Sequence, residues 1–168
     1  MSIEPRKPGE KALVIGYGNP SRQDDGAGYH VVNKLNRQLG RDSLAEDSDG
    51  LDEPQEAVNA IWVHQLVPEL AETISRYDMV IFVDAHTGAY AEEIQVEVVE
   101  PIYRPSLVSH HMKPGTLMAL AGDLYKRLPR SILVSIRGYE FDFGSELSAR
   151  TRELADDALA HVRELASV

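Results

Sequence analysis

The apolar residues of this chain fall into two kinds of pattern, which predict strands alternating with helices. Short runs of consecutive apolar, mostly β-branched residues predict buried strands at 11–19, 60–66, 79–86 and 131–139. Apolar residues at helical spacing predict amphipathic helices after each of these runs. We expect the first helix to run from Ala27 to a stop at Gly40 and the second to begin at Pro68. The third should lie between an N-cap at Thr116 and Pro129, and its buried residues should be Leu117, Leu120, Ala121, Leu124 and Leu128. The last should run through Leu154 to Ala166.

Residues 94–100 carry a different pattern, in which apolar and polar positions alternate. Alternation predicts a half-exposed strand near a sheet edge, and we expect this strand to be antiparallel. The whole pattern predicts an α/β fold: a three-layer α/β/α sandwich, phosphorylase/hydrolase-like, with a five-stranded mixed sheet. The 168 residues, 43% of them hydrophobic, suffice for one core, so we expect residues 1–168 to form a single domain.

Charge and composition narrow the classes of function. A formal net charge of −10 disfavours nucleic acid and anionic membranes as partners, because binding phosphate needs a cationic face. The absence of Cys excludes disulfides, thiolate metal sites and a cysteine nucleophile. Neither a secretory signal nor a membrane span is visible, so a cytoplasmic location is expected. Residues 40–56 hold seven carboxylates against one base, Arg41, and we expect them to form a solvated acidic loop within the domain.

Three carboxylates are expected at the carboxyl ends of strands, where open α/β sheets bind ligands. Asp24 and Asp25 follow the first strand, and Asp84 ends the very apolar run at 79–86. If the first and third strands are neighbours, these carboxylates come together. Each also has a plain structural interpretation: capping of the helix that starts near Gly26 for Asp24 or Asp25, and ordinary hydrogen bonding near the core for Asp84.

Carboxylates held close together repel, and a bound cation is one way to neutralise them. His110 and His111 offer imidazole nitrogen just before the Thr116 helix, and a mixed oxygen and nitrogen site suits Ni, Zn, Co or Mn rather than Ca. The alternative is that both histidines lie in an exposed turn. For His64 and His86, each near a strand end, a surface position is the first expectation.

Four motifs in order along the chain resemble those of the [NiFe]-hydrogenase maturation endopeptidases: LVIGYGNPSRQDDGAG, the strand end VIFVDA, a Ser-His-His loop and IRGYEFDFG-x-x-LS. The resemblance implies a five-stranded mixed sheet whose fourth strand is reversed. It implies removal of a C-terminal peptide from a hydrogenase large-subunit precursor after nickel insertion, with the nickel supplied by that precursor and recognised by Asp25, Asp84 and His111. For the cleavage itself we expect an aspartic-type or metal-dependent mechanism, in which the metal polarises the carbonyl or activates water. We assign Asp24 to it, as a base or hydrogen-bond partner, and Asp25.

The sequence departs from this family in places, and other classes of protein compete. Several branches of the family have Glu at the place of Asp25, and an Asp and a Gly-rich turn at the place of residues 64–69. A dinucleotide-binding motif is broken, since Ser21 stands where its third glycine belongs. A phosphoacceptor signalling domain would need Lys after the fifth strand, where Arg137 stands. A non-catalytic metal-binding protein with this fold remains an alternative.

Overall fold

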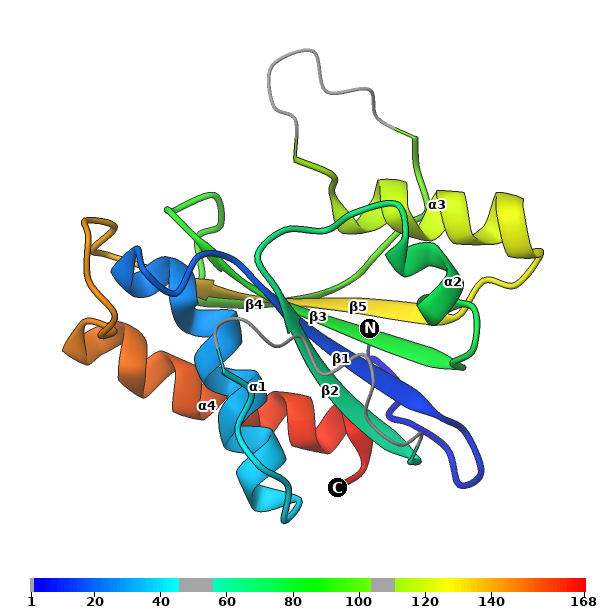
Figure 1. Cartoon of the computed structure of the whole chain (residues 1–168), viewed down its shortest axis with the longest axis horizontal. Helices are drawn as coiled ribbons and strands as arrows, with labels where there is room; N and C mark the ends of the chain where they lie inside the picture. Colours follow the sequence, from blue (N-terminus) through cyan, green and yellow to red (C-terminus); the bar gives the residue numbers. More distant parts are fainter. Residues whose placement is uncertain (1, 46–55, 104–110) are drawn as a thin grey trace.

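A five-stranded sheet lies between two layers of helices in the computed structural model of this chain, which describes residues 2–45, 56–103 and 111–168. One face of the sheet is covered by α1 (Ala27–Gln38) and α4 (Ala149–Ala166), and the other by α2 (Leu70–Ile74) and α3 (Pro114–Tyr125) (Figure 1). The predicted three-layer α/β/α sandwich is therefore confirmed. None of the described helices is long and apolar enough to cross a membrane.

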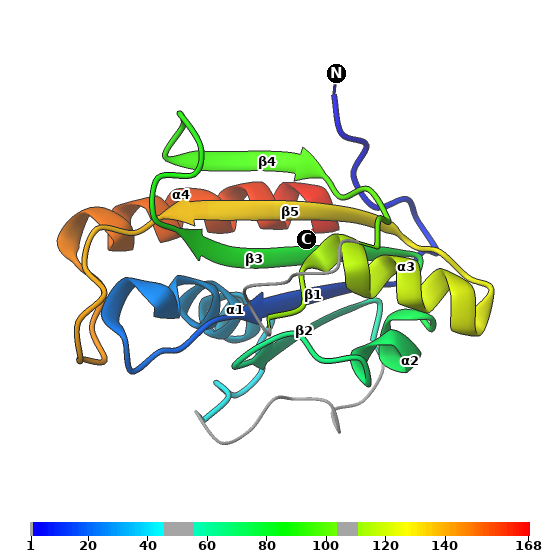
Figure 2. The same ribbon diagram turned by 90° about the horizontal axis from the view of Figure 1, so that it is seen from above.

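The strand order is β2-β1-β3-β5-β4, with a single reversed strand at one edge. The four parallel strands are β1 (Ala12–Tyr17), β2 (Val58–Val63), β3 (Met79–His86) and β5 (Arg130–Arg137). The edge strand β4 (Ile94–Val98) runs antiparallel to β5, as its alternating pattern predicted. Since β1 and β3 are neighbours, their carboxyl ends lie side by side at one end of the sheet (Figure 2).

The central strands are apolar over most of their length because successive side chains enter opposite helix layers. On β1, Ala12 and Val14 belong to the core under α1 and α4, whereas Leu13 and Ile15 belong to the core under α2 and α3. The closing helix α4 has the apolar face that its spacing predicted. Its buried residues include Leu154, Ala155, Ala158, Leu159, Val162, Leu165 and Ala166.

Helix α3 differs from its prediction at both ends. It begins at Pro114 with Lys113 as the N-cap, not at an N-cap formed by Thr116. A proline in the first turn costs no hydrogen bond, because that N–H would have no partner in the helix. The helix ends at Tyr125, and Lys126 turns left-handed with φ 53°. Leu124 and Leu128 therefore miss the core and are 61% and 52% exposed, although their spacing predicted burial.

The acidic segment 40–56 is not solvated throughout. Leu44 is buried against α1, where its backbone N–H donates to Asn33 Oδ1 (2.7 Å) and its carbonyl accepts from the Tyr29 hydroxyl (3.0 Å). Arg41 reaches across to Glu56 and pairs with its carboxylate at 2.8 Å. The expectation of a solvated loop is thus wrong for Leu44, an apolar residue whose partners lie on α1. Residues 46–55 lie outside the described residues.

Candidate active site

Close packing of glycines shapes the turn between β1 and α1. A Cβ on Gly16 would lie 2.4 Å from the Gly28 carbonyl oxygen, and one on Gly28 would lie 2.5 Å from the Val83 carbonyl oxygen. The start of α1 is therefore in direct contact with β1 and β3. Gly18 has φ +130°, and a Cβ there would lie 2.2 Å from the carbonyl oxygen of Asp25. These contacts explain why glycine recurs in the segment Gly16–Gly28, which carries Asp24 and Asp25 over the strand ends.

Asp24 is fully buried in the 3-10 turn Gln23–Gly26 and accepts five hydrogen bonds. The donors are the backbone N–H groups of Tyr139 (2.8 Å), Glu140 (2.9 Å) and Ser148 (2.7 Å), and the hydroxyls of Ser148 (2.7 Å) and Thr151 (2.8 Å). Burial alone raises the pKa of Asp24, but the donors together outweigh it, and the net pKa is lowered.

This geometry changes the interpretation of Asp24. Ser148 is the N-cap of α4, so Asp24 supports the start of a distant helix and not, as predicted, the helix that follows it. A general base needs an oxygen that reaches the substrate, whereas the Asp24 carboxylate is enclosed by its donors. The structure therefore favours a structural role for Asp24 over the predicted role as base.

Asp25, the next residue, is only partly buried. Its Oδ2 accepts a hydrogen bond from the backbone N–H of Asn19 at 2.8 Å. Asn19 is itself held by the N–H of Ser21, which donates to Asn19 Oδ1 at 2.9 Å. Within the described residues Asp25 Oδ1 accepts no hydrogen bond, so one oxygen is oriented by the protein and the other is open to a ligand.

Asp84 lies in β3, two residues before its end, with a donor on each carboxylate oxygen. The Tyr17 hydroxyl donates to Oδ2 at 2.8 Å, and the Ser135 hydroxyl donates to Oδ1. Burial raises the pKa of Asp84 most strongly, the two hydroxyls lower it, and the nearby charges of Asp25 and Glu97 raise it, to about 6. Asp84 and Asp25 thus share one electrostatic environment, as the neighbouring strands predicted.

Sequence reasoning missed the residues that surround Asp84. Ser135 is a polar residue inside the otherwise apolar run of β5, and the register places it directly opposite Asp84. That interruption was a usable signal. Tyr90 and Glu97 had no such signal, yet the Tyr90 hydroxyl donates to Glu97 Oε1 at 2.8 Å, and burial followed by Glu97 raises the pKa of Tyr90 to about 12.

The predicted histidine ligand is not part of this cluster. His111 is exposed in the segment before α3, and His110 lies outside the described residues. In the parts of the chain that the structure describes, no three His, Asp or Glu side chains lie close enough together to hold a metal ion. The structure thus gathers Asp25 and Asp84 and does not bring His111 to them.

The two histidines near strand ends differ from each other. His64 is exposed and lies edge-on to Trp62, with ring centroids 4.5 Å apart, in keeping with its expected surface position. His86 is buried, so the expected surface position is wrong for this residue. The side chains of β3 enter both helix layers, and the His86 ring packs edge-on against Tyr90 with centroids 5.1 Å apart.

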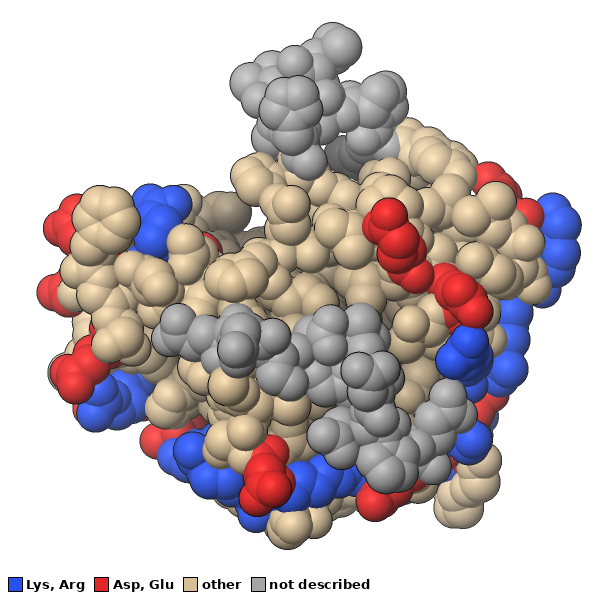
Figure 3. All heavy atoms as spheres, viewed as in Figure 1, with Lys and Arg blue, Asp and Glu red and all other residues tan. Residues whose placement is uncertain are grey.

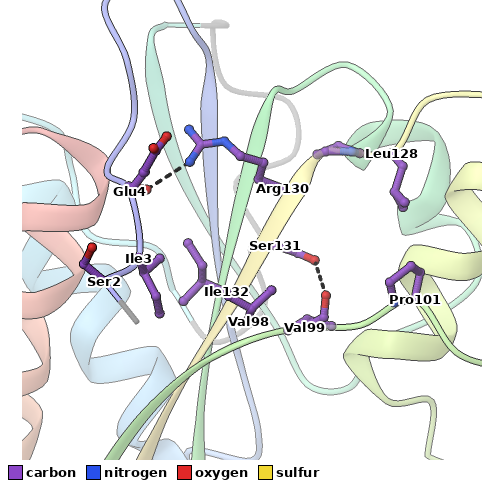
Figure 4. Close-up of a pocket in the computed structure, with 11 residues that line it drawn as sticks. Ser2, Ile3, Glu4, Val98, Val99, Pro101, Leu128, Arg130, Ser131 and Ile132 are labelled. Atoms are coloured by element: carbon purple, nitrogen blue, oxygen red, sulfur yellow. Dashed lines mark hydrogen bonds between the residues drawn. The ribbon is translucent and has the colours of Figure 1, made fainter.

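A hollow at the opposite end of the sheet has a different character. Figure 4 shows mainly apolar side chains around it, among them Ile3, Val98 and Ile132. Its polar groups have protein partners: Arg130 donates to the Glu4 carbonyl oxygen at 2.9 Å, and the Ser131 hydroxyl donates to the Val99 carbonyl oxygen at 3.3 Å. It lacks the neighbouring carboxylates of the Asp25–Asp84 end, which is therefore the better candidate for chemistry.

Several solved structures with the same architecture are hydrogenase maturation enzymes. The [NiFe] hydrogenase maturation protease HybD from Thermococcus kodakarensis is 20% identical, with a TM-score of 0.66 over 93% of this chain and 99% of that chain. The hydrogenase maturating endopeptidase HybD from E. coli is 18% identical, with a TM-score of 0.65 over 90% and 89%. The hydrogenase 2 maturation peptidase from Thaumarchaeota archaeon SCGC_AB-539-E09 is 22% identical, with a TM-score of 0.59 over 92% and 97%.

Comparison at the level of sequence adds nothing to these structural matches. No protein-family model matches the chain, and no curated protein matches it. At identities of 22% or less, structural likeness over almost the whole length of both chains establishes the fold. This chain has the fold of the [NiFe]-hydrogenase maturation proteases.

Proposed function

We propose that this protein is an endopeptidase that removes the C-terminal extension of a [NiFe]-hydrogenase large-subunit precursor once nickel has been inserted. One observation carries the proposal: Asp25 and Asp84 meet at the carboxyl ends of β1 and β3, on a fold shared with hydrogenase maturation proteases. The four sequence motifs that resemble this family include both residues.

In this proposal nickel is part of the substrate and serves as the recognition element. Asp25 has an open oxygen, and the repulsion between Asp25 and Asp84 is relieved when a cation comes between them. His111 is the third ligand that the motif resemblance assigns. A precursor without nickel would leave the two carboxylates facing each other with no cation, which gives the enzyme a physical means of rejecting it.

Peptide hydrolysis in this proposal uses carboxylates, since the chain has no Cys to act as nucleophile. Two neighbouring carboxyl groups in different environments can take different protonation states, which suits acid and base roles near neutral pH. Asp84 has a pKa of about 6, and Asp25 keeps an open oxygen at the same end of the sheet. Asp25 is therefore the residue that we assign to both cleavage and nickel contact.

The test uses one precursor in two states, loaded with nickel and free of nickel. We expect the purified protein to shorten the C-terminus of the loaded precursor only, as measured by intact-protein mass spectrometry. Asp25→Asn and Asp84→Asn should abolish this cleavage, since each removes a carboxylate from the site. Asp157→Asn is the matched control, because Asp157 is an exposed carboxylate on α4.

The possible results separate the parts of the proposal. Cleavage of both precursor states would disprove recognition through nickel and leave the protease activity standing. Cleavage of neither state by the wild-type protein would disprove the activity. Full activity in the Asp25→Asn and Asp84→Asn variants would place the site elsewhere.

A further inference from the structure

We propose that residues 138–148, which connect β5 to α4 and are called the 138–148 loop below, form a docking element for the protein substrate, with Phe143 as its anchor. This inference rests on the proposed function, because it takes the large-subunit precursor as the partner. It adds a contact outside the Asp25–Asp84 site.

Phe143 is 96% exposed, which is unusual for a large apolar side chain. Phe141, two residues earlier, is partly buried. Its ring packs against Gly138, where an added Cβ would lie 2.5 Å from Phe141 Cζ. The loop thus turns one phenylalanine inward and the other outward. Tyr139, also on the loop, is 48% exposed and stacks under the Arg137 guanidinium, 5.0 Å from the ring centroid.

The 138–148 loop is held along its length by the turn that precedes Asp25. Near its start, the N–H groups of Tyr139 and Glu140 donate to Asp24. Around Phe143, the N–H of Asp142 donates to Gln23 Oε1 at 3.1 Å, and the N–H of Gly144 donates to the Ser21 carbonyl oxygen at 3.0 Å.

The turn also donates to the loop: the N–H of Gln23 donates to the Gly144 carbonyl oxygen at 2.8 Å, as in a short β-bridge. The backbone on both sides of Phe143 is therefore fixed before any partner arrives. Binding through a preordered anchor costs little conformational entropy, which is the property of an effective contact residue.

The loop and the site lie at the same end of the molecule. The loop leaves the carboxyl end of β5, which pairs with β3 from Met79 to His86 and so ends beside Asp84 (Figure 2). The residues that hold the loop, Ser21 to Asp24, lead directly into Asp25. A protein that presents a peptide bond to Asp25 and Asp84 therefore lies within reach of Phe143.

The charge around Phe143 indicates the chemistry of its partner surface. Glu140, Asp142 and Glu146 are all exposed on this loop. Figure 3 shows acidic side chains beside basic ones at this end of the molecule. The partner therefore fits best if it offers an apolar pocket bordered by Lys or Arg. A second copy of this chain, at a net charge of −10, fits poorly.

The experiment measures binding of the nickel-loaded precursor by biolayer interferometry. We expect Phe143→Ala to raise the Kd at least tenfold with an unchanged melting temperature, since Phe143 contributes almost nothing to the core. Phe143→Leu should recover most of the affinity. Leu124→Ala is the control, because Leu124 is 61% exposed on α3 and lies away from this end of the sheet.

Each outcome decides a different point. An unchanged Kd in Phe143→Ala, with normal binding and cleavage by the wild-type protein, overturns the docking inference and leaves the proposed function intact. A wild-type protein that neither binds nor cleaves the precursor overturns the proposed function. Self-association that Phe143→Ala abolishes, measured by sedimentation, would assign the anchor to a second copy and overturn the inference.

Discussion

Replacing Asp24 by Asn tests whether this residue is structural or catalytic. Asn has nearly the same shape, but one carboxylate oxygen becomes an NH₂ donor. Placed at Oδ1, this donor faces the N–H of Ser148; placed at Oδ2, it faces the N–H groups of Tyr139 and Glu140. In either orientation at least one buried backbone N–H loses its acceptor, and the remaining donors lose a charged partner.

The expected cost follows from these contacts. An unsatisfied buried donor costs about 1–3 kcal/mol, and hydrogen bonds to a charged group are worth roughly 1 kcal/mol more than neutral ones. Since the donors share one carboxylate, the losses do not add, and we expect a net destabilisation of about 3 kcal/mol. In a chain of 168 residues this corresponds to a fall in melting temperature of about 6–12 °C.

The pH dependence of this loss follows from the lowered pKa of Asp24. Burial raises this pKa, but the backbone donors lower it by more than burial raises it. A carboxylate whose folded pKa lies below its unfolded value stabilises the fold above the unfolded pKa and ceases to do so as the pH falls through the folded one. The difference between wild type and Asp24→Asn should therefore be full at pH 7 and shrink below about pH 4.

Urea denaturation at pH 7 measures the effect, followed by the fluorescence of Trp62, the sole tryptophan, which is 2% exposed. Asp157→Asn again serves as the control and should unfold like the wild type. A free energy of unfolding within about 0.5 kcal/mol of the wild type would refute the structural role. If cleavage then fell by about 10²–10⁴-fold in a variant of unchanged stability, Asp24 would be a base.

Three further predictions concern Asp84 and the glycine contact between β1 and α1. Binding of the nickel-loaded precursor should weaken as the pH falls through about 6, because burial raises the pKa of Asp84 to about 6 and protonation removes a ligand. Tyr17→Phe removes a hydrogen bond that lowers this pKa, so it should move the midpoint upward in a series of Kd values measured against pH. Asp84→Asn should abolish cleavage and yet raise the free energy of unfolding at pH 7.5, by about 3 kcal/mol at most. The reason is that a carboxyl group with a raised pKa in the folded state destabilises the fold when it is ionised. An equal or lower stability in urea would contradict this. Gly16→Ala should lower the free energy of unfolding by about 2 kcal/mol or more, because its Cβ would collide with the Gly28 carbonyl oxygen. Gly122→Ala is the control in thermal melting and should be neutral or stabilising, because Gly122 is a helical position with only ordinary contacts.

The fold was predictable from sequence because its signals are local and repeated. Strand β3 has its predicted bounds, and α4 buries every residue that its spacing placed inward. The pattern failed at the end of α3, where the apolar spacing continues through Leu124 in the last helical turn to Leu128 beyond it, and both side chains are exposed. Spacing records which residues would share a face, but a left-handed residue such as Lys126 ends the helix without altering that spacing.

The site was predictable only in part, because its contacts join segments far apart in sequence. Asp84 could be found, since a carboxylate in a very apolar strand requires partners. Its donors Tyr17 and Ser135 depend on strand order and register, which sequence spacing does not specify. The donors to Asp24 come from residues 139–151, more than a hundred positions away, so no local pattern could separate its role from that of Asp25.

The different roles of the two adjacent carboxylates follow from the geometry of the turn that carries them. A 3-10 turn has about three residues per turn, so consecutive side chains point about 120° apart. When Asp24 points inward to the start of α4, Asp25 must point outward towards the strand ends. The inward carboxylate fixes the turn and the 138–148 loop together, and this holds the outward one in place. Asp25 lies on a loop, yet it is thereby held with the precision that a catalytic site requires, beside Asp84 on β3.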